Sequence, residues 1–126
     1  MRTPTELQAL MVENLFEPEQ LLATREWSEL RPGVNISPIY NTTQDGPSAA
    51  FLHYLPGAAV PRHLHTDFEH ILILQGSQSD GQVTYGRGTL LVSTPQSEHQ
   101  IHSAEGCIAL AVWVKPVAFV EITQGT

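Results

Sequence analysis

The chain has 126 residues, with 13 acidic side chains against 6 lysines and arginines, a net charge of -7 and one cysteine, Cys107. This length supports one ordinary hydrophobic core, and a single cysteine excludes an internal disulfide, a multi-cysteine zinc site and an iron–sulfur cluster. Because basic residues are scattered and no run of about 18 apolar residues is present, we expect a cytoplasmic protein without a signal peptide, a membrane span or a nucleic-acid partner.

The first 25 residues have the pattern of a short helical arm, and we expect residues 26–126 to form the main domain. Apolar residues recur at helical spacing in the arm: Leu7, Leu10, Met11 and Leu15. Pro18 ends this helix or restarts it for one more turn through residues 21–22. We expect the apolar face of the arm to pack on its own domain or on a sister subunit rather than to bind another partner.

From Arg31 onward, glycines and prolines separate short apolar runs, which is typical of an all-β protein. The expected strands are residues 34–40, 49–55, 69–75, 82–85, 89–92, 108–114 and 118–122. Many short strands at this spacing predict an antiparallel sandwich or barrel, and a jelly roll is the architecture that we expect. A parallel α/β sheet is disfavoured, because no helical pattern of useful length lies between the strands.

All six histidines lie between positions 53 and 102, and the sharpest group is His63 and His65 followed by Glu69. Residues i and i+2 of an extended segment face the same side, so both imidazoles point one way while Leu64 points away. Glu69 begins an apolar run, where a carboxylate needs a cation or several donors to offset its desolvation. A metal ion held with the two imidazoles supplies that cation. The alternative is a solvated group in which Glu69 pairs with Arg62 or with nothing.

Two glycines extend this group to Gly57-x5-His63-x-His65-x3-Glu69-x6-Gly76, which resembles the first motif of the cupin superfamily at every position. A second cupin motif supplies a further histidine, and the string Pro95-Gln96-Ser97-Glu98-His99 after Gly88 is similar to it. This string has one residue fewer between the proline and the histidine than the general pattern, a serine at the glycine position, and no later asparagine.

These departures resemble the ChrR-like cupin branch, in which a Pro-Gly-Ser-x-His string is followed by a serine and a Gly-Cys pair. Ser103 and Gly106-Cys107 match that pattern, and Gln96 replaces the glycine of the string. The resemblance covers about residues 26–120. It implies a small antiparallel jelly-roll barrel that holds one divalent transition-metal ion on His63, His65, Glu69 and His99. Three imidazoles and one carboxylate suit zinc or iron, and also manganese, nickel or copper.

The remaining histidines and the cysteine receive separate interpretations. His53 shares a strand face with apolar residues, so it lies either in the core or beside the metal ligands as a base that orients them. His70 and His102 are expected at the surface, because strand alternation turns them away from Glu69 and His99. Cys107 is expected to be a small buried residue rather than a reactive thiol.

The resemblance to small cupins implies a metal-dependent, dioxygenase-like enzyme that acts on a small polar molecule such as a diketone. The expected cavity wall consists of Ile71, Ile73, Leu90 and Val92. The alternative is a sensor or ligand-binding module, since the branch is named after a zinc-binding anti-sigma factor that responds to oxidative stress. This chain resembles only the cupin domain of that factor. A purely structural zinc is disfavoured, because such sites favour thiolates. Edge strands and the habit of single-domain cupins imply a homodimer.

Overall fold

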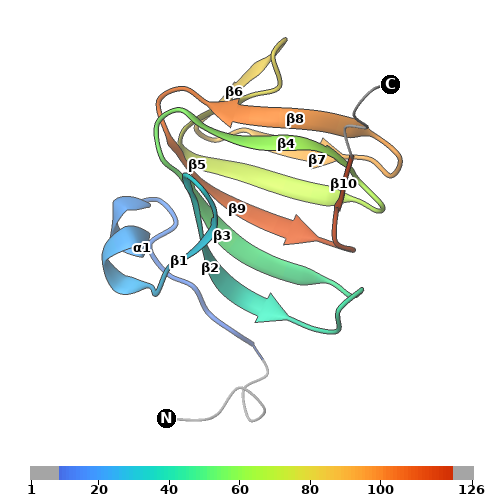
Figure 1. Cartoon of the computed structure of the whole chain (residues 1–126). Coiled ribbons are helices and arrows are strands. Elements are labelled where there is room, and N and C mark those ends of the chain that lie inside the picture. The colour runs from blue at the N-terminus through green and yellow to red at the C-terminus, as the bar shows by residue number, and fades with distance from the viewer. Residues whose placement is uncertain (1–8, 121–126) are drawn as a thin grey trace.

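Ten strands curl into one continuous antiparallel sheet within residues 9–120, the part of the chain that the computed structural model describes (Figure 1). One short helix, α1 (Glu19–Thr24), lies outside the sheet. The strands are β1 (Ser28–Arg31), β2 (Val34–Asn41), β3 (Ser48–Tyr54), β4 (Ala58–Leu64), β5 (Glu69–Ser79), β6 (Thr84–Gly86), β7 (Leu90–Ser93), β8 (Glu98–Ser103), β9 (Cys107–Trp113) and β10 (Ala118–Phe119). The predicted all-β class and the short N-terminal helix are confirmed. No helix in this range is long and apolar enough to cross a membrane.

The sheet order is β1-β2-β3-β9-β5-β8-β4-β10, and β6 and β7 also pair with β5. The long strand β5 therefore belongs to both halves of the curled sheet. Figure 1 shows its central position. The two ends of the order come together through a side-chain contact, because the guanidinium carbon of Arg31 on β1 lies 4.5 Å from the ring centroid of Phe119 on β10. Among the described residues, the curled sheet is therefore closed between β1 and β10 by side chains rather than by backbone hydrogen bonds.

The helix that the apolar spacing predicts between residues 7 and 15 is wrong in its described part, and residues 1–8 lie outside the described range. Residues 9–14 are irregular, and Asn14 has a left-handed backbone with φ of 69°. An isolated helix of this length is marginal unless packing covers its apolar face, and Leu10 and Met11 are exposed. The helical turn forms instead after Pro18, where Leu21 is buried.

Three strands were not expected from the sequence: β1, β4 and β8. Their sequences lack an apolar run, because β4 contains Pro61-Arg62-His63 and β8 begins Glu98-His99-Gln100. These two strands nevertheless pair with each other, with an irregularity between Val60 and His63 and with His63 opposite His99. The expected strand at 82–85 is shifted to β6, and only Ala118–Phe119 of the expected 118–122 forms a strand, with residues 121–122 outside the described range.

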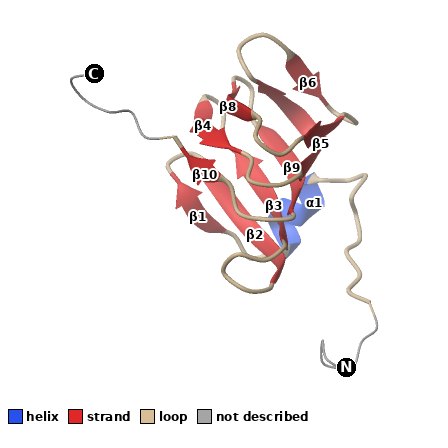
Figure 2. Cartoon of the chain, turned by 90° about the vertical axis from the view of Figure 1, so that its right-hand side faces the viewer, coloured by secondary structure: helices blue, strands red, loops and turns tan. Residues whose placement is uncertain are grey.

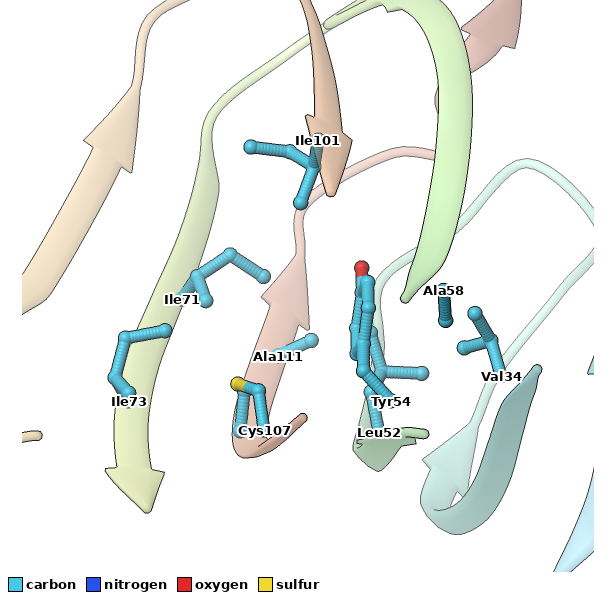
Figure 3. Close-up of a cluster of buried hydrophobic side chains, with 10 residues drawn as sticks. Val34, Leu52, Tyr54, Ala58, Ile71, Ile73, Ile101, Cys107 and Ala111 are labelled. Atoms are coloured by element: carbon cyan, nitrogen blue, oxygen red, sulfur yellow. The ribbon is translucent and has the colours of Figure 1, made fainter. Parts of the chain in front are cut away.

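Two apolar clusters lie on opposite faces of β3, β9 and β5. The inner cluster fills the barrel and includes Val34, Leu52, Tyr54, Ala58, Ile71, Ile73, Ile101, Cys107, Ala109 and Ala111 (Figure 3). On the outer face, Leu21 of α1 packs on Phe51, Leu74 and Ile108, and Figure 2 shows α1 behind these strands. The indole nitrogen of Trp27 donates a hydrogen bond to the carbonyl oxygen of Leu21 at 3.0 Å, which ties the helix to the sheet.

Backbone geometry explains the motif glycines. Gly57 and Gly76 have φ of 86° and 76°, a region that residues with a Cβ rarely adopt. A Cβ at Gly76 would also overlap the carbonyl oxygen of Gly106, so two segments of backbone pass too closely there for any other residue. Gln96 occupies the same left-handed region with φ of 74°, and it stands where the ChrR-like pattern has a glycine.

Candidate metal centre

The structure brings together the four side chains that the sequence predicts as metal ligands. His63 lies on β4, His65 follows the end of β4, Glu69 is the first residue of β5, and His99 lies on β8. One ligand atom from each side chain lies within 4.8 Å of those of the other three. The three imidazole rings meet edge to face, with centroids 4.4 to 5.0 Å apart.

Backbone carbonyl groups fix which nitrogen of two histidines faces the cluster. Nδ1 of His63 lies 2.9 Å from the carbonyl oxygen of Pro61, and Nδ1 of His65 lies 2.9 Å from that of Ser97. The hydroxyl oxygen of Ser97 is also 3.0 Å from Nδ1 of His65. A carbonyl oxygen can only accept, so Nδ1 carries the proton in each ring and Nε2 keeps a free lone pair. This is the arrangement that orients histidine for a metal.

A divalent metal ion fits these donors. Nε2 of His65 is buried and has no hydrogen-bond partner in the described part of the chain, although it lies 3.2 Å from Oε1 of Glu69. Nε2 of His99 is 4.0 Å from the same oxygen. Lone pairs and a carboxylate that face one another in a buried site are stabilised by a positive charge between them, which a metal ion or a proton on His65 can supply. Ligand atoms about 2.0–2.2 Å from one ion lie at most about 4.4 Å apart, so the group needs to contract only slightly.

Trp113 holds the carboxylate from the other side. Its Nε1 donates a 2.7 Å hydrogen bond to Oε2 of Glu69, which leaves Oε1 facing the histidines. The two residues lie directly opposite each other on β9 and β5. Glu69 is only 5% exposed, so this bond offsets part of its desolvation. Sequence reasoning missed the roles of Trp113 and Ser97, because they are 44 and 32 residues away from the ligands that they contact.

Burial and mutual charge set the protonation of the cluster. Burial lowers the pKa of His63, and burial together with the nearby His63 and His65 lowers the pKa of His99 to about 4. Burial also opposes the charged forms of His65 and Glu69. Their mutual attraction outweighs it, so that the pKa of His65 is raised and that of Glu69 is lowered. At neutral pH the cluster therefore offers two neutral imidazoles and a carboxylate, and a metal displaces any proton on His65.

His63, Glu69 and His99 line a cavity of about 80 Å³. Its walls are mostly apolar and consist of Leu30, Val34, Leu52, Tyr54, Val60, Ile71, Ile101, Trp113, Val117 and Phe119, with Arg31 and Gln78 as further polar members. Of the predicted wall only Ile71 is correct. Ile73 is buried in the core, while Leu90 and Val92 are 58% and 43% exposed. On β7 the residue that packs inward is Leu91, so Leu90 and Val92 face the opposite side from the one predicted.

The other histidines lie away from the cluster. His53 stands between two residues that line the cavity, so it points to the outer face, where its ring meets Trp27 edge-on at 6.0 Å. Of the two positions that the sequence left open for His53, the one beside the candidate ligands is therefore wrong. His70 is half-buried rather than at the surface, with Nδ1 buried and unpaired, whereas His102 is exposed as expected.

Two further residues settle alternatives that the sequence left open. Burial raises the pKa of the Cys107 thiol to about 12, so this residue is a protonated core side chain at neutral pH. The guanidinium of Arg62 pairs with Glu98 at 3.0 Å, on the exposed side of β4 and β8. Glu69 therefore does not form the pair with Arg62 that the alternative of a solvated glutamate proposes.

Comparisons with known proteins agree with this geometry. The model of the ChrR cupin-like domain family matches residues 20–118. No curated protein matches the chain. A solved complex of SigE with the anti-sigma ChrR from Rhodobacter sphaeroides contains a chain that is 27% identical, with a TM-score of 0.64 over 76% of this chain. The match covers 54% of that chain, so this protein spans about half of its length.

Two solved structures titled as acetylacetone dioxygenases share the fold. The putative enzyme from Methylibium petroleiphilum is 13% identical, with a TM-score of 0.71 over 91% of this chain and 85% of that one. The enzyme from Acinetobacter johnsonii is 9% identical, with a TM-score of 0.72 over 96% and 82%. Identities this low establish a common fold and nothing finer.

Proposed function

The chain belongs to the ChrR cupin-like domain family, and on that premise we propose that it is a metal-dependent, dioxygenase-type enzyme that acts on a small polar molecule such as a diketone. One observation carries the proposal: three of the four candidate ligands line a cavity. A structural metal site closes its ion off with protein ligands, whereas a catalytic site leaves a position for water or substrate. A metal at the edge of an apolar cavity has that open position.

In this proposal His63, His65, Glu69 and His99 hold zinc or iron, with manganese, nickel or copper as alternatives. Such an ion supplies Lewis-acid polarisation of a carbonyl group or, as iron, the redox chemistry that dioxygen requires. The chain itself keeps the carboxylate aimed through Trp113. Its apolar walls limit water in the cavity, which strengthens the electrostatic interactions of a bound substrate.

Metal analysis of untagged protein, followed by oxygen-uptake assays of the iron-loaded form with acetylacetone and other small diketones, tests the proposal. We expect stoichiometric metal and measurable uptake in the wild type. Glu69→Gln should lower the uptake strongly, whereas Glu98→Gln, an exposed glutamate one strand away, should leave it unchanged. Tightly held zinc, with no turnover of any small ketone in any metal form, overturns the enzyme proposal.

The second candidate function is a metal-containing sensor or ligand-binding module without catalysis. The observation that favours it is the 27% identity to a chain of the complex with the anti-sigma ChrR, the highest identity among the structures compared above. This function requires the same four ligands but no turnover. Zinc that stays bound through purification, together with a change in the melting temperature when a small ligand is added, would support it over the enzyme.

We also propose that the chain forms a homodimer. Met11 and Phe16 are 79% and 91% exposed in the segment before α1, and apolar side chains this exposed favour association. Within the described residues, β1 and β10 each pair with one neighbouring strand, and such edge strands favour symmetric pairing between subunits. Light scattering at micromolar concentration should give twice the chain mass of 13.9 kDa, and a mass equal to one chain contradicts this proposal.

A further inference from the structure

Hydrogen-bond donors gather around the cavity. Besides the candidate ligands and Trp113, three polar side chains line it, Arg31, Tyr54 and Gln78, and each carries a donor. Among the lining residues that the structure describes, the one carboxylate is Glu69, which Trp113 and the candidate metal already occupy. The cavity therefore offers positive and donating groups to whatever it binds.

Arg31 is a cation whose charge is not paired with an acidic side chain inside the described part of the chain. Its guanidinium lies on the ring of Phe119, and within residues 9–120 it forms no ion pair or side-chain hydrogen bond. An aromatic ring supplies no oxygen acceptor, so within the described residues this contact leaves the N–H groups of the guanidinium available to an anionic ligand. Phe119 stands opposite His63 in the register of β10 and β4, so the stack sits directly beside the metal ligands.

Two buried donors line the same space. Gln78 is 2% exposed, and within residues 9–120 its Nε2 has no oxygen acceptor, with the weakly accepting thiol of Cys107 beside it. Tyr54 is 4% exposed, and burial raises the pKa of its phenol, so the hydroxyl keeps its proton. Figure 3 shows that hydroxyl at the tip of the ring, pointing away from Leu52. A buried donor without an acceptor costs about 1–3 kcal/mol, which a ligand with acceptor oxygens would recover.

From these contacts we infer that the cavity binds a small oxo acid, with its carboxylate on Arg31, and that Arg31 selects for this charge. The inference rests on the proposed function and narrows its small polar substrate to one that carries a carboxylate, in preference to the diketone named there as an example. A divalent ion with three neutral imidazoles and one carboxylate carries a net charge of +1. Arg31 adds a second positive charge on the wall of the same cavity, within a chain whose net charge is -7. The volume of about 80 Å³ and the apolar walls restrict the rest of the molecule to a few carbon atoms.

Calorimetric titration of zinc-loaded protein with pyruvate and with butane-2,3-dione tests the charge preference. The two probes have nearly the same shape, but only pyruvate carries a carboxylate in place of one methyl ketone. Charge-assisted hydrogen bonds to a guanidinium account for about a 10- to 100-fold difference in affinity. We therefore expect pyruvate to bind at least about 10-fold more tightly than the diketone to the wild type.

Arg31→Gln should weaken pyruvate binding by about 10- to 100-fold and leave binding of butane-2,3-dione within about 3-fold. Arg31→Lys, which keeps the charge but loses the planar fork, should fall between the two. Arg62→Gln changes the net charge equally at a residue outside the cavity, and it should bind both probes as the wild type does. Far-ultraviolet circular dichroism checks that each variant is folded. If Arg31→Gln does not fold, the pyruvate affinity of Arg31→Lys tests the inference instead.

Zinc content, measured before and after each titration, separates this inference from the proposed function. Zinc-loaded protein that binds both probes equally, or that binds pyruvate equally with and without Arg31, overturns the oxo-acid inference and leaves the metal site standing. Protein that takes up no zinc overturns the proposed function, and the inference with it.

Discussion

The inner and outer histidines of this barrel form a natural comparison. His63 and His65 direct a free Nε2 toward Glu69, and each has Nδ1 on a backbone carbonyl oxygen. His53 and His102 lie on the outer side of the same sheet, one against Trp27 and the other exposed. The residue type is the same, but only the inner group has its tautomer fixed and a carboxylate in front of it.

This difference indicates that a histidine here is suited to bind a metal because of the hydrogen bond at Nδ1 as much as because of the lone pair on Nε2. A histidine whose Nδ1 is held by a carbonyl oxygen has its lone pair aimed before any metal arrives, so less conformational entropy is lost on binding. Within residues 9–120, neither outer histidine has a ring nitrogen held by a carbonyl oxygen in this way. Substitutions on the two sides should therefore have very different effects on metal binding.

The largest effect is expected from the double variant His63→Ala/His65→Ala. Loss of two of four ligands should weaken metal binding by more than about 100-fold, beyond the range measured for residues that only support a ligand. The outer control, His102→Ala, should keep one metal per chain. Metal content of dialysed protein by mass spectrometry decides the point. Full metal retention in the double variant would remove the basis of the proposed site.

Glu69→Gln should weaken metal binding by about 10- to 100-fold. The amide keeps the size of the side chain and its bond to Trp113, but it loses the negative charge, so a divalent site rises from +1 to +2. Glu98→Gln removes an exposed charge that only pairs with Arg62, and it should leave affinity unchanged. Competition with a metal chelator measures both variants. Equal affinities for the two variants would show that Glu69 is not a ligand.

Acid should destabilise the metal-free protein through His99. Its pKa in the folded state is about 4, below the unfolded value of 6.5, so the unfolded chain binds more protons between these two pH values. The stability contributed by neutral His99 is thus present above pH 6.5 and lost as the pH falls toward 4. Urea unfolding of the wild type and of His99→Gln should diverge within this window, with the wild type losing more. The outer control His102→Gln should follow the wild type, and parallel curves for all three would contradict the prediction.

Ser97→Ala should have a smaller effect on metal binding, less than about 10-fold. The hydroxyl that contacts Nδ1 of His65 is removed, but the carbonyl oxygen of Ser97 still accepts from the same nitrogen. Chelator competition with this variant measures the contribution of the hydroxyl alone. A loss as large as that of Glu69→Gln would mean that the hydroxyl, rather than the backbone, orients the ring.

Gln96→Gly is expected to give the smallest change, a gain of at most about 1 kcal/mol in the free energy of unfolding. The left-handed backbone at Gln96 costs about 1–2 kcal/mol for a residue with a Cβ, and the greater freedom of glycine in the unfolded chain offsets part of the gain. Urea unfolding of the metal-free protein provides the measurement. A loss of stability would show that the Gln96 side chain contributes contacts that outweigh its strain.

The candidate ligand set could be predicted from the sequence because most of it lies in one short segment that resembles the first cupin motif. Alternation places His63 and His65 on one side, and Glu69 follows after only three residues. His99 was reached through the second cupin motif, although the strand that carries it was not expected. A strand such as β8, with only Ile101 and Ser103 buried, has too few apolar residues to stand out in a sequence.

The supporting residues could not be predicted, because they depend on how distant strands align. Trp113 meets Glu69 only through the register of β9 and β5, and a shift of one residue would place Val112 there instead. The same kind of shift explains the error in the cavity wall, where Leu91 rather than Leu90 or Val92 packs inward. His53 was ambiguous for a related reason, since a strand covered on both faces gives no signal of which face holds the cavity.

The most direct test of the metal site is a crystal structure of untagged protein, with diffraction data collected on both sides of the absorption edge of the metal found by elemental analysis. The account predicts one anomalous peak per chain, within bonding distance of Nε2 of His63, His65 and His99 and of Oε1 of Glu69. A peak at any other place, or none between these four side chains in protein that contains stoichiometric metal, would contradict it.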